Sequence, residues 1–224
     1  MSFLHTLPEN DLIAPGVEMI SIPDSRFKCA RIQVVFELPL DEHRAARTLL
    51  LDVLQQGSDK YPSRNRLAQR LEHLYGARIN VYSERACEAH RLSFAVRTTS
   101  DAYLFNEESV LKDGLELLGE LLWSPLRGQE NAFKRDIVER ERKNLLDMLV
   151  ERKDDRSAYA SERFFRHLCE GEEYGKLSWG SSEDVRSVDL EGLEAARLEL
   201  INNAQVMIIC SGDFHADIIK KWAS

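Results

Sequence analysis

The sequence predicts an α+β domain in which helices pack against a mostly antiparallel sheet of about five to six strands. Apolar and polar residues alternate through residues 90–97, which is typical of a strand with one buried face. Leu49, Leu50 and Val53 instead recur at the spacing of a helix that buries one side. Because strands and helices follow one another without strict βαβ alternation, a parallel doubly wound sheet is not expected.

The strands can be placed from alternation and from turn residues. Residues 1–16 are expected to form an irregular arm, because Pro8 and the pair Pro15-Gly16 interrupt regular structure. Beyond the arm, strands are predicted at 17–22, 28–38, 78–83, 89–98 and 206–212. The turn Pro23-Asp24-Ser25 predicts that the first two of these strands form a hairpin.

Helical periodicity predicts the remaining elements. Their approximate ranges are 41–57, 63–75, 105–124, 131–151, 157–169 and 189–202. Gly57 is expected to end the first of these helices in the left-handed C-cap conformation. Ser63 is expected to cap the second helix with its hydroxyl group.

Composition narrows the classes of function. The chain has 224 residues, of which 43% are hydrophobic, so it can bury a sizeable core; one domain is expected from residue 17 to 224. Its formal net charge of −8 argues against nucleic acid or an anionic membrane as the main partner. No signal peptide and no membrane-spanning run is expected. The four cysteines are scattered singly, which favours reduced thiols in a cytoplasmic protein.

A more specific pattern starts at the apolar helix, which ends in Leu54-Gln-Gln-Gly-Ser58. A second helix follows, then Leu74-Tyr-Gly-Ala-Arg-Ile-Asn80, and the pair Glu141-Arg142 lies on a later helix. In order and spacing these segments resemble the N-terminal domain of the pitrilysin/insulinase family of inverted zinc metallopeptidases, which includes mitochondrial processing peptidase. The resemblance covers about residues 20–213 and looks closest to a noncatalytic bacterial branch that works beside an intact paralogue.

The resemblance also identifies what this sequence lacks. Active members carry H-x-x-E-H on the first helix, where the two histidines bind zinc and the glutamate is the general base. Here the five positions hold Thr48-Leu49-Leu50-Leu51-Asp52, and Met148 replaces a further acidic residue. Without histidine the zinc affinity should collapse, so no catalytic residue, no metal ligand and no zinc are expected. Glu141 matches the family's third ligand and is expected to be a solvated helix residue.

A near-match to the zinc motif lies on the following helix. The segment Gln69-Arg-Leu-Glu72-His73 differs from H-x-x-E-H in its first position. Because glutamine is a poor zinc ligand, and because the family order places the metal on the preceding helix, a solvated helix face is favoured over a metal site here.

The resemblance further implies a peptide-binding edge strand. Family members add an extended peptide to the sheet edge beside the metal helix, which is β-augmentation. The matching strand is Ile79, Asn80, Val81, Tyr82 and Ser83, with Asn80 and Ser83 at the family's polar positions. Backbone pairing needs no zinc, so extended peptides are candidate partners. An ordinary edge strand guarded by Arg78, Glu84 and Arg85 is an equally good interpretation.

The expected function is that of an inactive peptidase-like domain, acting as a structural or peptide-binding subunit of a clamshell assembly. The resemblance implies a homologous insulinase-type domain or an active peptidase paralogue as the partner. Either a second domain lies outside this sequence or single domains associate. Two alternatives stay open: a zinc-dependent metalloendopeptidase with displaced ligands, and a pure assembly protein that binds no peptide.

Overall fold

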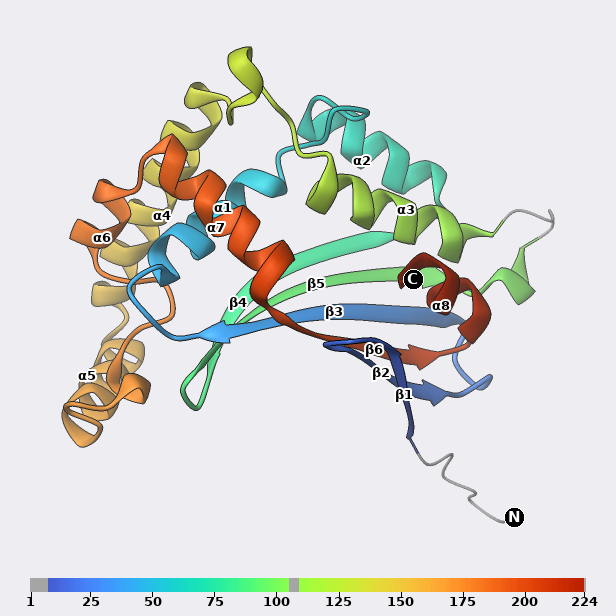
Figure 1. Ribbon diagram of the computed structural model, residues 1–224, viewed down its shortest axis with the longest axis horizontal. Coiled ribbons are helices and arrows are strands. Elements are labelled where there is room, and N and C mark those ends of the chain that lie inside the picture. Colours follow the sequence, from blue (N-terminus) through green and yellow to red (C-terminus); the bar gives the residue numbers. More distant parts are fainter. Residues whose placement is uncertain (1–7, 105–108, 224) are drawn as a thin grey trace.

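A six-stranded sheet is the base of the structure, a computed structural model that describes residues 8–104 and 109–223 (Figure 1). Its strands are β1 Glu9–Ala14, β2 Val17–Pro23, β3 Cys29–Pro39, β4 Arg78–Ala86, β5 Ala89–Thr99 and β6 Gln205–Gly212. They lie in the order β1-β2-β6-β3-β5-β4, and all neighbours are antiparallel except β2 and β6. The predicted mostly antiparallel sheet is confirmed.

Two predictions about the N-terminal part of the chain are wrong. Residues 9–14, expected in an irregular arm, form β1 and pair with β2 at one edge of the sheet. The expected hairpin of β2 and β3 does not form, because β6 lies between these strands and pairs with both. Pairing with a strand from the far end of the chain therefore outweighs the local turn signal. Residues 1–7 of the expected arm lie outside the described residues.

Most of the helices lie on one side of this sheet (Figure 1). The helices are α1 Arg44–Leu54, α2 Arg64–His73, α3 Val110–Trp123, α4 Arg135–Asp154, α5 Arg156–Leu168, α6 Ser182–Ser187, α7 Leu190–Asn203 and α8 Ala216–Ala223. Helices α1, α3, α7 and α8 cover one face, and no described helix covers the other (Figure 1). Helices α6 and α8 were not predicted, and the predicted start of the third helix at 105 lies outside the described residues.

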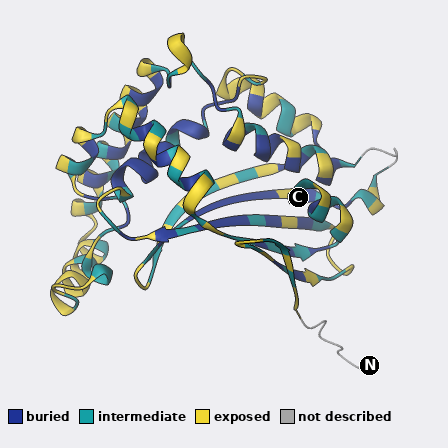
Figure 2. Cartoon of the chain, in the orientation of Figure 1, coloured by how far each residue is buried: buried dark blue, intermediate teal, exposed yellow. Residues whose placement is uncertain are grey.

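The core fills the space between the sheet and the helices (Figure 2). In β3 and β5 alternate residues point into it, so that Val34 lies opposite Phe94 and Phe36 lies opposite Leu92. The rings of Phe36 and Phe94 meet edge to face, 5.7 Å between centres. Burying each such side chain contributes about 1.5–3 kcal/mol. The apolar residues that alternate in 90–97 therefore face the core, and the polar residues between them face the open side of the sheet.

Helix α1 is enclosed by α4, α6, α7 and the β4–β5 pair, and nearly all of its residues are buried. It is shorter than predicted, and Gly57 is not its left-handed cap. The helix ends at Leu54 with Gln55 as its cap, and Gly57 has φ of 150°. A Cβ atom at Gly57 would collide with the carbonyl oxygen of Tyr61, so the close approach of the following loop is what requires glycine. The predicted hydroxyl cap at Ser63 is confirmed by its bond to the Arg66 N–H.

The cysteines are unpaired, as predicted, and Cys210 is buried in the core. Burial raises the pKa of the Cys210 thiol to about 12, which makes it unreactive. Within the described ranges, no helix has both the length and the apolar character that crossing a bilayer requires.

Candidate functional site

Helix α1 holds the altered motif against the edge strand β4. The Oγ1 atom of Thr48, the first motif position, lies 3.4 Å from the Oγ atom of Ser83 in β4. The same hydroxyl donates a hydrogen bond of 3.2 Å to the carbonyl oxygen of Ser178, in the loop before α6. Thr48 therefore sits where a helix, a sheet edge and a loop meet, and the structure brings the predicted motif and the predicted edge strand together.

The middle of the motif consists of core residues. Leu49 and Leu50 have no exposed surface, and Leu51 is only 2% exposed. The sequence resemblance aligns Leu51 with the general base of the family motif, but a buried leucine side chain carries no atom that can accept a proton. Packing against the sheet and the neighbouring helices accounts for all three leucines.

Asp52 and Glu141 are the acidic part of the site. Glu141 is buried in α4 and accepts hydrogen bonds from Nε of Arg140 at 2.8 Å and Nδ2 of Asn144 at 2.9 Å. The prediction of a solvated Glu141 is therefore wrong. Arg140 also donates to Oε1 of Gln56 at 3.0 Å, which ties α4 to the end of α1. Burial, and then repulsion by Glu141, raise the pKa of Asp52 to about 6.

These side chains do not fit a catalytic zinc ion. They offer two carboxylates and a hydroxyl but no imidazole, and Arg140 already neutralises Glu141. Elsewhere in the described chain, no three His, Cys, Asp or Glu side chains gather in a way that could hold a metal ion. The near-motif on α2 is exposed, and Nδ1 of His73 lies 2.6 Å from the carbonyl oxygen of Gln69 in its own helix.

Strand β4 forms the second edge of the sheet, paired with β5 on one side only. Ile79, Val81 and Ser83 point towards the helices and are half-buried. Asn80 and Tyr82 are exposed on the opposite face, so the two predicted polar positions, Asn80 and Ser83, lie on different faces. Along the other side of β4 the backbone has no partner strand among the described residues, and such an edge can accept one.

No family model matches the chain. The chain is 26% identical over 207 residues to the "Probable inactive metalloprotease YmfF" of Bacillus subtilis (strain 168), covering 92% of this chain and 48% of the relative. A conserved protein from Enterococcus faecalis V583 has a similar structure, with a TM-score of 0.86 and 24% identity over 96% of this chain and 51% of that one. The peptidase M16 inactive domain from Pseudomonas fluorescens has a TM-score of 0.75 and 17% identity, covering 97% of this chain and 49% of that one. In sequence and in fold the chain is therefore similar to M16 peptidase domains of the inactive type.

The family resemblance inferred from the sequence, to the pitrilysin/insulinase or M16 peptidases, is therefore confirmed. This M16-type domain spans about half the length of the curated relative that it matches, and about half of each of the two solved structures. Each relative is thus long enough to hold a second domain of this size.

One end of the edge strand of this M16-type domain is fixed by a residue that the sequence indicated only as a charged guard. Arg85 donates hydrogen bonds to the carbonyl oxygens of Tyr174 and Lys176, and its guanidinium lies 4.0 Å from the centre of the Tyr174 ring. Tyr174 belongs to the short turn Glu173–Gly175 after α5. Arginine stacking on an aromatic ring pins this turn to β4. No local pattern in the sequence indicates this contact.

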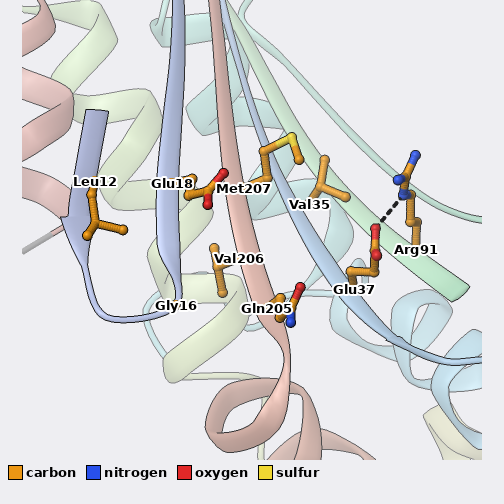
Figure 3. A pocket seen from close by; sticks show the side chains of 9 residues that line it. All are labelled: Leu12, Gly16, Glu18, Val35, Glu37, Arg91, Gln205, Val206 and Met207. Carbon is orange, nitrogen blue, oxygen red and sulfur yellow. Dashed lines mark hydrogen bonds and ion pairs between the residues drawn. The ribbon is translucent and has the colours of Figure 1, made fainter. Parts of the chain in front are cut away.

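The face of the sheet away from the helices carries a shallow hollow of about 330 Å³ (Figure 3). Leu12 of β1, Val35 of β3 and Met207 of β6 contribute apolar side chains to it. Glu37 and Arg91 form an ion pair of 2.7 Å beside it. Leu12 is 73% exposed, so this M16-type domain presents apolar surface on its open face.

Proposed function

We propose that this M16-type domain is a noncatalytic subunit that holds an extended peptide along β4 and pairs with a homologous domain or an active peptidase paralogue. The observation that carries the proposal is the unpaired edge of β4, which lies directly beside the motif helix through the Thr48–Ser83 contact. A peptide strand added there gains backbone hydrogen bonds without any catalytic side chain.

The noncatalytic part of the proposal rests on the donor set. Leu51 cannot act as a base, and the carboxylate of Glu141 is occupied by Arg140 and Asn144. Three protein ligands and an open water position are needed for a catalytic zinc site. We therefore infer that the domain holds no zinc and cleaves no peptide by this route.

The pairing part of the proposal is supported by length and by surface. The matched relatives are about twice as long as the chain, which leaves room in each for a second domain. The open face of the sheet exposes apolar side chains such as Leu12 and Met207, which a second domain closing over this face would shield.

Peptide capture can be tested by blocking the edge with proline. A fluorescein-labelled peptide of about ten residues, alternating threonine and valine, matches one strand in length. Its binding is measured by fluorescence anisotropy with the wild type and with Asn80→Pro and Val81→Pro. Outward N–H groups alternate along an edge strand, so one of these adjacent prolines removes an outward donor and leaves the ladder with β5 intact.

We expect that variant to lose binding while keeping the wild-type unfolding midpoint. A Leu12→Pro variant, in the opposite edge strand β1, is the matched control and should bind normally. Binding that survives both prolines in β4 would contradict capture at this edge. An absence of peptide binding together with tight binding of a homologous domain would instead favour the pure assembly protein.

Metal content tests the noncatalytic part separately. The purified chain is dialysed against zinc-containing buffer, and zinc is measured by plasma mass spectrometry together with casein hydrolysis. We expect background zinc and no hydrolysis. Stoichiometric zinc with hydrolysis that a chelator abolishes would establish a peptidase with displaced ligands.

A further inference from the structure

Three arginines stand in a row across the open face of the sheet. Arg31 of β3 lies opposite Arg97 of β5, and Arg97 lies opposite Arg78 of β4. All three are exposed. Cβ atoms of opposite residues in antiparallel strands are about 4.5–5.5 Å apart, so three positive charges lie side by side. We call Arg31, Arg97 and Arg78 the arginine row.

No carboxylate within the described ranges forms an ion pair with the arginine row. Arg31 donates to Oε1 of Gln33 at 3.0 Å, and Arg97 contacts Sγ of Cys29 at 3.6 Å. The polar contacts of the row are therefore with uncharged groups.

The other end of the same three strands shows the opposite arrangement. There Arg91 of β5 lies between Glu37 of β3 and Glu84 of β4 in the strand register, and it pairs with Glu37 at 2.7 Å. Charges of alternating sign are the stabilising choice across a sheet, whereas like charges opposite one another are destabilising. The arginine row breaks this rule in a chain with 38 acidic and 30 basic residues. Positions that break a local folding rule are expected where function requires them.

The arginine row ends at the free edge of the sheet, because Arg78 lies in β4, the edge strand. A strand added to β4 would carry one of its side chains directly beside Arg78 on the open face. Two hollows of about 500 Å³ each adjoin this position. One includes Arg31, Arg97, Asn80 and Tyr82 in its lining, and the other includes Arg78, Arg97 and Lys28.

We propose that the arginine row binds the carboxylate of an aspartate or glutamate in a peptide paired with β4, so that this edge selects acidic extended segments. This inference rests on the proposed peptide capture and names the class of peptide. Arginine suits the role because its planar guanidinium binds a carboxylate through two parallel hydrogen bonds. A net charge of −8 repels nucleic acid over the rest of the surface, which favours a peptide over a polynucleotide.

Three labelled peptides test the proposal with the whole chain. They share the alternating threonine–valine backbone and carry two residues of one kind, glutamate, glutamine or lysine, at positions that face the open side. Anisotropy at about 0.05 M and about 0.5 M salt separates charge attraction from backbone pairing, because salt screens exposed charges. We expect the glutamate peptide to bind about tenfold more tightly than the glutamine peptide at low salt, and the lysine peptide to bind most weakly.

The variant Arg97→Gln should abolish the preference for glutamate and leave the affinity for the glutamine peptide unchanged. It removes a charge from between two like charges, so it should fold at least as well as the wild type, which thermal unfolding checks. Arg186→Gln, which removes the same charge from an exposed position of α6, is the matched control and should keep the preference.

Each other outcome overturns the inference in a distinguishable way. Equal binding of the glutamate and glutamine peptides would refute acidic selection and leave peptide capture standing. Failure of all three peptides to bind would refute both. A single-stranded oligonucleotide that binds more tightly than the glutamate peptide, and loses affinity in Arg97→Gln, would identify a general polyanion site instead.

Discussion

Asp52 of α1 lies within electrostatic reach of Glu141 of α4, and burial together with this second carboxylate raises the pKa of Asp52 to about 6. The sequence resemblance aligns these two residues with zinc ligands of active family members. In this domain Arg140 neutralises the carboxylate of Glu141. Asp52 forms no ion pair with any described residue. The charged form of Asp52 therefore destabilises the folded state.

Asp52→Asn is expected to stabilise the domain at neutral and alkaline pH. Because the folded-state pKa lies above the value of about 4 for an unfolded chain, the folded state binds this proton more tightly. The stabilising effect of the proton is complete below about pH 4 and is lost as the pH rises through about 6. Asparagine removes the loss, so we expect a gain of about 2–3 kcal/mol at pH 8 and less than about 1 kcal/mol at pH 4.

Urea unfolding of both proteins at the two pH values measures this difference. Asp147→Asn, at an exposed position of α4, is the control and should change stability equally at both pH values. A gain from Asp52→Asn that does not depend on pH would show that titration of Asp52 is not its source.

Arg47→Met is expected to destabilise the fold strongly. The guanidinium of Arg47 has no exposed surface and makes two hydrogen bonds with Glu199 of α7, at 2.7 and 3.1 Å, and one with Asp41 at 3.0 Å. Removing one partner of a buried ion pair leaves the others uncompensated, which costs about 3 kcal/mol. Denaturant unfolding measures the loss. Arg166→Met, which removes the ion pair with Glu162 on the surface of α5, is the control and should cost about 0.5 kcal/mol or less. Equal losses of stability in the two variants would argue against a structural role for the ion pairs of Arg47.

Short-range patterns predicted the elements of this fold better than their arrangement. The alternation in β5 and the spacing of Leu49 and Leu50 in α1 reflect local geometry, so both elements were predicted. The position of β6 between β2 and β3 depends on pairing across nearly the whole chain, and no local residue pattern encodes it. Strand β1 was missed for a different reason: Pro8 and Pro15-Gly16 flank the strand instead of interrupting it, and Pro15-Gly16 forms the turn through which β1 pairs with β2.

The candidate site shows the same division. The motif positions and the edge strand could be predicted because family order places them next to each other, and the Thr48–Ser83 contact joins them. The burial of Glu141 was missed, because its partners Arg140 and Asn144 look like ordinary surface residues in a charged helix. The arginine row was missed because the register that aligns Arg31 with Arg97 is a property of the folded sheet.

His90 should make the domain sensitive to acid. It is fully buried in β5, and neither ring nitrogen has a hydrogen-bond partner among the described residues. Burial, and then the positive charges of Arg47 and Arg44 against the opposing charge of Asp41, lower its pKa to about 4. The pKa of histidine in an unfolded chain is near 6.5. The stability that neutral His90 contributes is therefore fully present above about pH 6.5 and is lost as the pH falls through about 4.

His90→Phe keeps an aromatic ring and removes the titration. We expect its stability relative to the wild type to improve by about 2 kcal/mol between pH 7.5 and pH 5, measured by urea unfolding. His73→Phe, at an exposed position of α2, is the control and should show no such change. An equal stability difference between His90→Phe and the wild type at both pH values would contradict this prediction. It would mean that the pKa of His90 is the same in the folded and unfolded states.

Arg97→Glu should stabilise the free domain, because the new carboxylate would lie between Arg31 and Arg78. Opposite-charge pairs across a sheet contribute about 0.2–1 kcal/mol each, so we expect a gain of about 1 kcal/mol in urea unfolding at low salt. The mirror variant Arg91→Glu places a carboxylate between Glu37 and Glu84 and should lose stability instead. Both effects should shrink at about 0.5 M salt, since exposed charges are screened. Stability changes of opposite sign in the two variants would show that the arginine row destabilises the free domain, as expected of a surface that binds an acidic partner. A loss of stability with Arg97→Glu would instead mean that the row stabilises the sheet by itself.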